Sequence, residues 1–189
     1  SALAARRISS DIMNYEQLQL PAVFRDVADV HQGLILLCGV TGSGKSTTIA
    51  AMLQQINETR PAHILTLEDP IEIMFKDSMS MVNQREVGLD LPSFEMGLRA
   101  LVRENPDVVL IGELRDRETF QAAVQAAETG HLVFGTVHAS SVSQCFGRIY
   151  NLFPPEERSL IREMFSSTLQ SLIYQRLLKT LRKDIPRVP

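Results

Sequence analysis

Residues 39–46, with the sequence GVTGSGKS, limit what this chain can fold into more than any other stretch. An apolar run at residues 34–38 precedes them, and residues 47–53 have the composition of a helix. The pattern G-x-x-x-x-G-K-S between a strand and a helix is typical of a phosphate-binding P-loop. Its glycines permit a tight turn in which successive N–H groups face one anion, and the helix start adds its positive dipole end. The motif predicts a nucleoside-triphosphate site.

The lysine and serine that end this motif are expected to have specific partners in a nucleotide. Lys45 neutralises the β- and γ-phosphates of ATP, and the Ser46 hydroxyl binds Mg²⁺. A glycine-rich turn without a nucleotide is the alternative, but the Lys-Ser pair and both flanking elements argue against it. The predicted ATP-binding residues are Gly39, Thr41, Gly42, Ser43, Gly44, Lys45, Ser46 and Thr47.

Composition narrows the class of protein. The 189 residues fit one domain, and 44% hydrophobic with 22% charged residues is typical of a globular chain. The net charge of −3 argues against a general nucleic-acid or acidic-membrane binder. The two cysteines, Cys38 and Cys145, fit no pairing rule, and Cys38 is expected to be a buried thiol in a reducing compartment.

Two further apolar runs end in carboxylates. Residues 63–67 lead into Glu68-Asp69-Pro70-Ile71-Glu72, and residues 108–111 lead into Gly112-Glu113. In α/β proteins the carboxyl ends of buried strands face the ligand crevice. Glu113 occupies the Walker B position and is expected to hold Mg²⁺ through water, while a carboxylate of the first run orients or deprotonates water. A solvated acidic loop is the alternative for residues 68–72.

Histidines bracket the predicted strand at residues 132–137. His131 and His138 are interpreted either as polar sensors of nucleotide state or as core histidines with satisfied bonds. Metal ligation is a weaker third interpretation, because no cysteine or carboxylate completes a recognisable spacing. His31 and His63 are interpreted as structural.

The remaining periodicity predicts mostly helices. Residues 78–82 form a candidate short strand followed by polar residues 83–86, Ser93 is a candidate N-cap, and a helix spans residues 118–128. The tail from residue 140 is predicted to be helical. Its amphipathic stripe consists of Leu160, Ile161, Met164, Phe165, Leu169, Leu172, Ile173, Leu177 and Leu178.

Five motifs in order carry a resemblance to a known family. The chain resembles the type II/type IV secretion ATPases over about residues 16–180, and within them the ATPases that retract type IV pili. The motifs are GVTGSGKSTT at 39–48, ILTLEDPIE at 64–72, NQREV at 83–87, DVVLIGELRD at 107–116 and TGHLVFGTVH at 129–138. The resemblance places the catalytic glutamate on Glu72, the Walker B glutamate on Glu113 and nucleotide-sensing histidines on His131 and His138. Glu68 and Asp69 are the reserve candidates for the base.

This resemblance implies a RecA-like P-loop motor domain, an α/β fold whose mostly parallel central sheet is flanked by helices. Residues 1–26 are expected to be a linker and lead-in and residues 27–189 the motor domain, with a PAS-like amino-terminal domain and the extreme carboxyl-terminal part lacking. The family resemblance further implies a cytoplasmic hexameric ring at the inner face of the cytoplasmic membrane. Such a ring would hydrolyse ATP with Mg²⁺, act on an inner-membrane pilus platform protein, and power pilus retraction and twitching motility.

Other functions fit parts of the same sequence. A pilus-assembly or type II secretion ATPase is one alternative, although many of those carry a four-cysteine zinc module that begins after a Q-R-L segment. Here Gln175-Arg176-Leu177 is followed by residues 178–183 without a cysteine, which favours retraction. A non-hydrolysing, ATP-responsive ring module is another alternative, and both Glu72 and Glu113 argue against it. A DNA-translocating motor is disfavoured by the acidic balance.

Ring assembly is expected to complete the site. The resemblance implies ATP sites between subunits, so the fragment by itself is expected to be a monomer or a weak oligomer with poor activity. An arginine from a neighbouring subunit is expected to reach the nucleotide. The candidates are Arg85, Arg99, Arg103 and Arg115.

Overall fold

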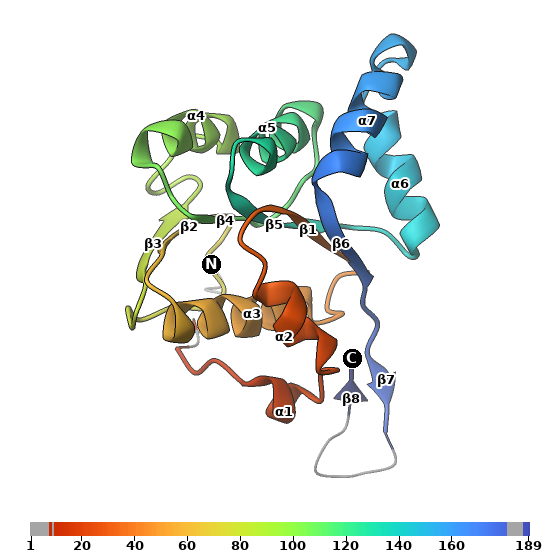
Figure 1. Ribbon diagram of the computed structural model, residues 1–189. Coiled ribbons are helices and arrows are strands. Elements are labelled where there is room, and N and C mark those ends of the chain that lie inside the picture. The colour runs from red at the N-terminus through yellow and green to blue at the C-terminus, as the bar shows by residue number, and fades with distance from the viewer. Residues whose placement is uncertain (1–7, 9, 181–186) are drawn as a thin grey trace, which may run out of the picture.

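A six-stranded, all-parallel sheet forms the centre of the protein, with strand order β3-β2-β4-β5-β1-β6 (Figure 1). The computed structural model describes residues 8, 10–180 and 187–189. Helices connect most of the strands, as parallel pairing requires a crossover from one end of the sheet to the other. The strands are β1 Gly33–Cys38, β2 His63–Glu68, β3 Met81–Glu86, β4 Val108–Ile111, β5 Leu132–Val137 and β6 Leu169–Tyr174.

The central strands are buried because helices cover both faces of the sheet (Figure 1). Every residue of β1, β4 and β5 is buried, which agrees with the continuous apolar runs in the sequence. The first face carries α1 Tyr15–Leu18, α2 Val23–Ala28 and α3 Lys45–Thr59. The opposite face carries α4 Phe94–Glu104, α5 Arg117–Glu128, α6 Val142–Asn151 and α7 Arg158–Thr168. The predicted α/β class, with a parallel sheet between helices, is therefore confirmed.

The core is divided between these two faces. On the α5 side, the Phe120 ring meets Phe153 and Phe165 edge-on, with centroid distances of 5.9 and 5.6 Å. On the α3 side, Tyr15 and Phe24 are buried against the same apolar cluster as α3. The expected lead-in therefore contributes two helices to the packed body between residues 15 and 28, while residues 1–7 and 9 lie outside the described residues.

Predicted helix boundaries agree closely with those observed. Ser93 caps α4, because its side chain accepts a hydrogen bond from the Met96 N–H. The helix predicted at 118–128 spans Arg117–Glu128. No helix among residues 8, 10–180 and 187–189 is both long and apolar enough to cross a membrane.

Two sequence predictions are wrong, one about the bounds of a strand and one about the helical tail. The strand expected at residues 78–82 lies instead at Met81–Glu86, so the polar residues 83–86 belong to it. This β3 is an edge strand whose residues are half-buried or exposed, and the sheet therefore tolerates polar side chains there.

The tail is only partly helical. Its apolar stripe is in α7 up to Phe165, but Leu169, Leu172 and Ile173 belong to β6, which pairs in parallel with β1. The open edge of β1 supplies backbone hydrogen bonds that a helix would leave unused there. Beyond β6, β7 Leu178–Lys179 and β8 Arg187–Val188 form a small antiparallel pair.

Candidate active site

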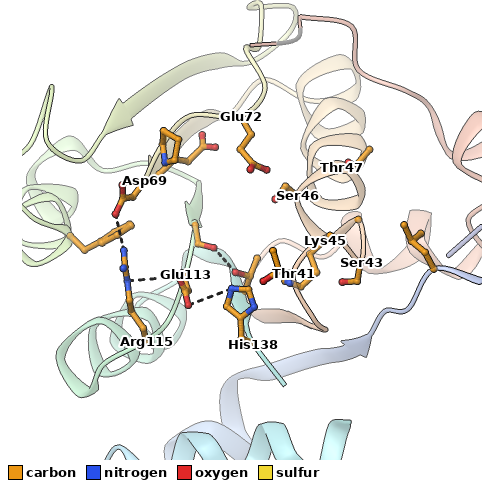
Figure 2. Close-up of a pocket in the computed structure, with 18 residues that line it drawn as sticks. Thr41, Ser43, Lys45, Ser46, Thr47, Asp69, Glu72, Glu113, Arg115 and His138 are labelled. Carbon is orange, nitrogen blue, oxygen red and sulfur yellow. Dashed lines mark hydrogen bonds and ion pairs between the residues drawn. The ribbon is translucent and has the colours of Figure 1, made fainter. Parts of the chain in front are cut away.

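A polar cleft of about 570 Å³ lies at the carboxyl-terminal edge of the sheet (Figure 2). The segments that follow β1, β2, β4 and β5 all contribute to its wall. This edge is where parallel α/β sheets hold their ligands. The lining residues are Thr41, Gly42, Ser43, Gly44, Lys45, Ser46, Thr47, Glu68, Asp69, Pro70, Glu72, Phe94, Gly112, Glu113, Arg115, Thr136, His138 and Leu177.

The P-loop connects β1 to α3 as the sequence predicts. Gly42 and Gly44 have φ angles of 76° and 88°, a region that favours glycine, and Gly44 is the N-cap of α3. The α3 dipole and its first N–H groups thus face the cleft. All the predicted ATP-binding residues line the cleft except Gly39, which lies at the base of the loop.

Lys45 is held by its own loop. It is buried, and its Nζ donates to the carbonyl oxygens of Gly39 at 2.9 Å and Val40 at 3.1 Å. Burial lowers the pKa of Lys45, while the negative charges of Glu113 and Glu72 act in the opposite direction. The ammonium therefore lies at the base of the cleft with carboxylates nearby.

Glu113 is the centre of a chain of polar and charged side chains across the cleft. Its Oε1 lies 3.6 Å from His138 Nε2, and its Oε2 lies 3.8 Å from Arg115 Nε. Arg115 in turn donates from Nη2 to Asp69 Oδ2 at 2.9 Å (Figure 2). The ends of β5, β4 and β2 are thereby linked through side chains. Both distances to Glu113 are too long for hydrogen bonds.

The acidic run after β2 supplies two carboxylates with different surroundings. Glu68 Oε1 accepts from Thr66 Oγ1 at 2.7 Å and from Gln84 Nε2 at 3.2 Å, and burial raises the pKa of Glu68. Figure 2 shows the Glu72 carboxylate directed toward Ser46 at the start of α3. Of these two acids, Glu72 is the better placed to act on a group bound at the P-loop.

The two predicted sensor histidines are separated by the whole length of β5. His138 follows the strand and lines the cleft beside Glu113. His131 precedes it, and its Nδ1 donates to the Ala126 carbonyl at 2.9 Å near the end of α5. The structure thus does not bring His131 to the cleft of this chain, because parallel strands place their two ends at opposite edges of the sheet.

The oxygen groups around the P-loop fit Mg²⁺. The Ser46 hydroxyl is exposed to the cleft, and the carboxylates of Glu72 and Glu113 face the same space. Hydroxyl and carboxylate oxygens are the ligands that Mg²⁺ accepts. Within the described residues no group of three or more His, Cys, Asp or Glu side chains could hold a metal by itself. This donor set fits an ion bound jointly with nucleotide phosphates.

Several cleft residues were missed by the sequence interpretation. Phe94, at the start of α4, lies under the Arg115 guanidinium, with 5.5 Å from Cζ to the ring centroid. Thr136 donates its hydroxyl hydrogen to the Gly112 carbonyl and so ties β5 to the Walker B turn. Leu177, beyond β6, also lines the cleft. Of these three residues, only Thr136 could have been found from the sequence, by its inward position in the predicted strand.

The four candidate arginines have different environments. Arg115 lines the cleft of its own chain. Arg85 pairs with Glu104 at 3.4 Å, and Arg99 pairs with Glu95 at 2.6 Å, both outside the cleft. Arg103 is exposed on α4.

Comparisons with known proteins show which family the chain resembles in sequence. Residues 4–186 match the family model described as "Type II/IV secretion system protein". The chain is 49% identical over 93% of its length to the type IV pilus retraction ATPase PilT of Pseudomonas aeruginosa, and 48% identical over 95% to a twitching motility protein of Neisseria gonorrhoeae. It spans 51% and 48% of these two relatives, or about half of each.

A solved structure is similar throughout the chain. The crystal structure of the pilus retraction motor PilT with bound ADP superposes with a TM-score of 0.92 at 48% identity. The superposition covers 97% of this chain and 53% of that one.

Proposed function

The chain belongs to the family of type II/IV secretion system proteins, and from that premise we propose that it is the ATP-hydrolysing core of a motor that retracts type IV pili. One observation supports this most directly. The P-loop, Glu72, Glu113 and His138 come from four different strand ends and converge on one cleft of a size suited to a nucleotide. The similarity to the retraction ATPase of Pseudomonas aeruginosa supports the specific role.

The chain's own residues divide the reaction among them. The N–H groups at the start of α3 and the Lys45 ammonium bind the phosphates of ATP. Glu72 orients the attacking water and accepts its proton, and His138, next to Glu113, contacts the γ-phosphate. Ser46, and Glu113 through water, would hold Mg²⁺, which would supply positive charge to neutralise the phosphates.

The whole protein is proposed to act as a ring. Arg115 or another of the four arginines would reach the nucleotide of a neighbouring subunit in a hexamer. The ring would work in the cytoplasm at the inner face of the membrane, on the pilus platform protein. The similarity to the retraction and twitching proteins supports a role in pilus movement.

The nucleotide site is tested by Lys45→Ala. Loss of a buried cation that binds phosphate is expected to weaken ATP binding roughly tenfold to a hundredfold. Lys76→Ala removes an exposed lysine that does not line the cleft and is the matched control. Calorimetric titration measures the affinity of both variants for a non-hydrolysable ATP analogue. If Lys45→Ala binds the analogue as tightly as the parent protein, the P-loop is not the nucleotide site.

The direction of the motor is tested in cells. A strain whose only copy of the gene carries Glu72→Gln is expected to keep its pili and to lose twitching motility. A retraction motor acts on pili that have already been assembled. Electron microscopy of pili and a subsurface motility assay read the two properties separately. Loss of the pili themselves would instead identify an assembly ATPase.

A further inference from the structure

Two buried polar atoms beside the P-loop lack a hydrogen-bond partner among the residues that the structure describes. They are the Ser43 hydroxyl oxygen and the side-chain amide oxygen of Gln175. The two residues are only 3% and 4% exposed. Leaving a buried polar atom unpaired is unfavourable, so such atoms in a native protein call for an explanation.

Both residues lie against the same part of the loop. A Cβ on Gly39 would lie 2.5 Å from Ser43 Oγ and 2.5 Å from the Gln175 carbonyl oxygen. A Cβ on Gly44 would lie 2.8 Å from Gln175 Nε2. The Gln175 backbone carbonyl therefore leaves no room for a side chain at residue 39, whereas at residue 44 the positive φ of 88° favours glycine.

Gln175 is itself fixed to the sheet. It directly follows β6, and its backbone N–H donates at 2.8 Å to the carbonyl of Cys38, the last residue of β1. Two residues later, Leu177 lines the cleft, with Cδ2 at 3.6 Å from the same Cβ position on Gly44. The segment after β6 therefore packs against the P-loop and is itself bonded to the end of β1.

The two unpaired atoms are chemically complementary. A serine hydroxyl donates one hydrogen, and the amide oxygen of glutamine accepts. When phosphates draw the Lys45 ammonium away, the carbonyls of Gly39 and Val40 lose their donor. Gly39 is adjacent to Ser43 Oγ and to the backbone carbonyl of Gln175, so a change of the loop backbone at Gly39 would move the Ser43 hydroxyl relative to Gln175.

We propose that Gln175 is a positioning residue of the P-loop: when a nucleotide's β-phosphate occupies the loop, the Ser43 hydroxyl donates to Gln175 Oε1. This bond holds the phosphate-binding conformation of the loop from the β6 side. The inference rests on the proposed function, because it takes the bound anion to be a nucleoside di- or triphosphate.

A double-mutant cycle tests the pairing. Ser43→Ala and Gln175→Met are each expected to weaken binding of a non-hydrolysable ATP analogue about three- to tenfold, as the loss of one hydrogen bond does. The double variant is expected to bind no more weakly than either single variant, because the second change removes nothing further. The matched control is Thr41→Ala, an exposed hydroxyl of the same loop, whose effect should add to that of Gln175→Met.

Thermal melting without nucleotide separates this role from a purely structural one. Because both atoms are unpaired in this structure, either single change is expected to leave the melting temperature unchanged or raised. If Gln175→Met does not fold, Gln175→Glu keeps an acceptor oxygen and its coupling to Ser43→Ala should persist. Additive losses of affinity in the cycle would overturn this inference and leave the proposed function standing. So would a lowered melting temperature with an affinity equal to that of the parent protein. Failure of the parent protein to bind the analogue would overturn the proposed function as well.

Discussion

The two edges of the sheet carry the same kinds of residue but use them differently. At the amino-terminal edge, Asp107 accepts from the backbone N–H of His63 at 2.7 Å, and His131 donates to the Ala126 carbonyl at 2.9 Å. At the carboxyl-terminal edge, Glu113 lies 3.6 Å from His138 and 3.8 Å from Arg115. The acid and the histidine of the amino-terminal edge are joined to backbone groups by short bonds, whereas the contacts of Glu113 with His138 and Arg115 at the other edge are long.

This difference indicates where ligand chemistry is possible. A side chain bonded to a neighbouring backbone group stabilises the fold and has little capacity left for a ligand. Side chains that face one another at long distances in a cleft can exchange those contacts for a substrate. Substitutions at the carboxyl-terminal edge should therefore change affinity and turnover, and those at the amino-terminal edge should change stability.

The largest expected effect separates two acids of the carboxyl-terminal edge. Glu72→Gln should lower the turnover of ATP about 10²–10⁴-fold while ATP affinity is retained, because a base acts only on the attacking water. Glu113→Ala should weaken Mg²⁺-dependent binding as well as turnover. Steady-state kinetics and analogue titrations at varied Mg²⁺ distinguish them, and the opposite pattern would assign the base to Glu113.

A smaller effect compares the two histidines of β5 directly. His138→Ala should reduce the preference for ATP over ADP by roughly tenfold, since only a group that touches the γ-phosphate distinguishes the two nucleotides. His131→Ala should leave that preference unchanged and act through the packing of α5. Paired affinities and thermal melts measure both variants. An equal loss of ATP and ADP binding in His138→Ala, with a large drop in melting temperature, would identify it as a structural histidine.

Next in size is a change at the amino-terminal edge alone. Asp107→Ala removes the acceptor of the His63 N–H and should cost about 1 kcal/mol, or roughly 2–4 °C in melting temperature for a domain of this size. ATP-analogue affinity should stay at the parental value. A changed affinity with unchanged stability would contradict the assigned difference between the edges.

The smallest effect concerns pH. Burial raises the pKa of Glu68 in the folded protein above its unfolded value. Its contribution to stability is therefore complete at pH below the unfolded pKa and is lost as the pH rises through the folded pKa. Glu68→Gln should remove this loss, so the variant should gain in melting temperature relative to the parent as the pH rises from about 4 toward neutrality. A constant difference across that range would show that Glu68 does not titrate with a raised pKa.

The sequence was informative where local pattern and topology coincide. The P-loop follows from spacing, and the meeting of Glu113 and His138 follows because carboxyl ends of parallel strands share one edge. By contrast, Leu169, Leu172 and Ile173 fit a helical stripe, and only the open edge of β1, distant in the chain, turns them into β6. The contact of Gln175 with the glycines of the loop depends on the same pairing of β6 with β1, so it could not be predicted from the sequence either.

The two carbonyl bonds to Lys45 also bear on which anions the cleft admits. An anion that recruits the ammonium competes with two acceptors already in place. Chloride or acetate offers a single centre of charge for this exchange, whereas a polyphosphate offers several oxygens to the lysine and to the N–H groups of α3 at once. An anion must therefore carry several charged oxygens to displace the two carbonyl bonds of Lys45, and common monovalent anions of the cell should bind the cleft weakly and compete poorly with ATP.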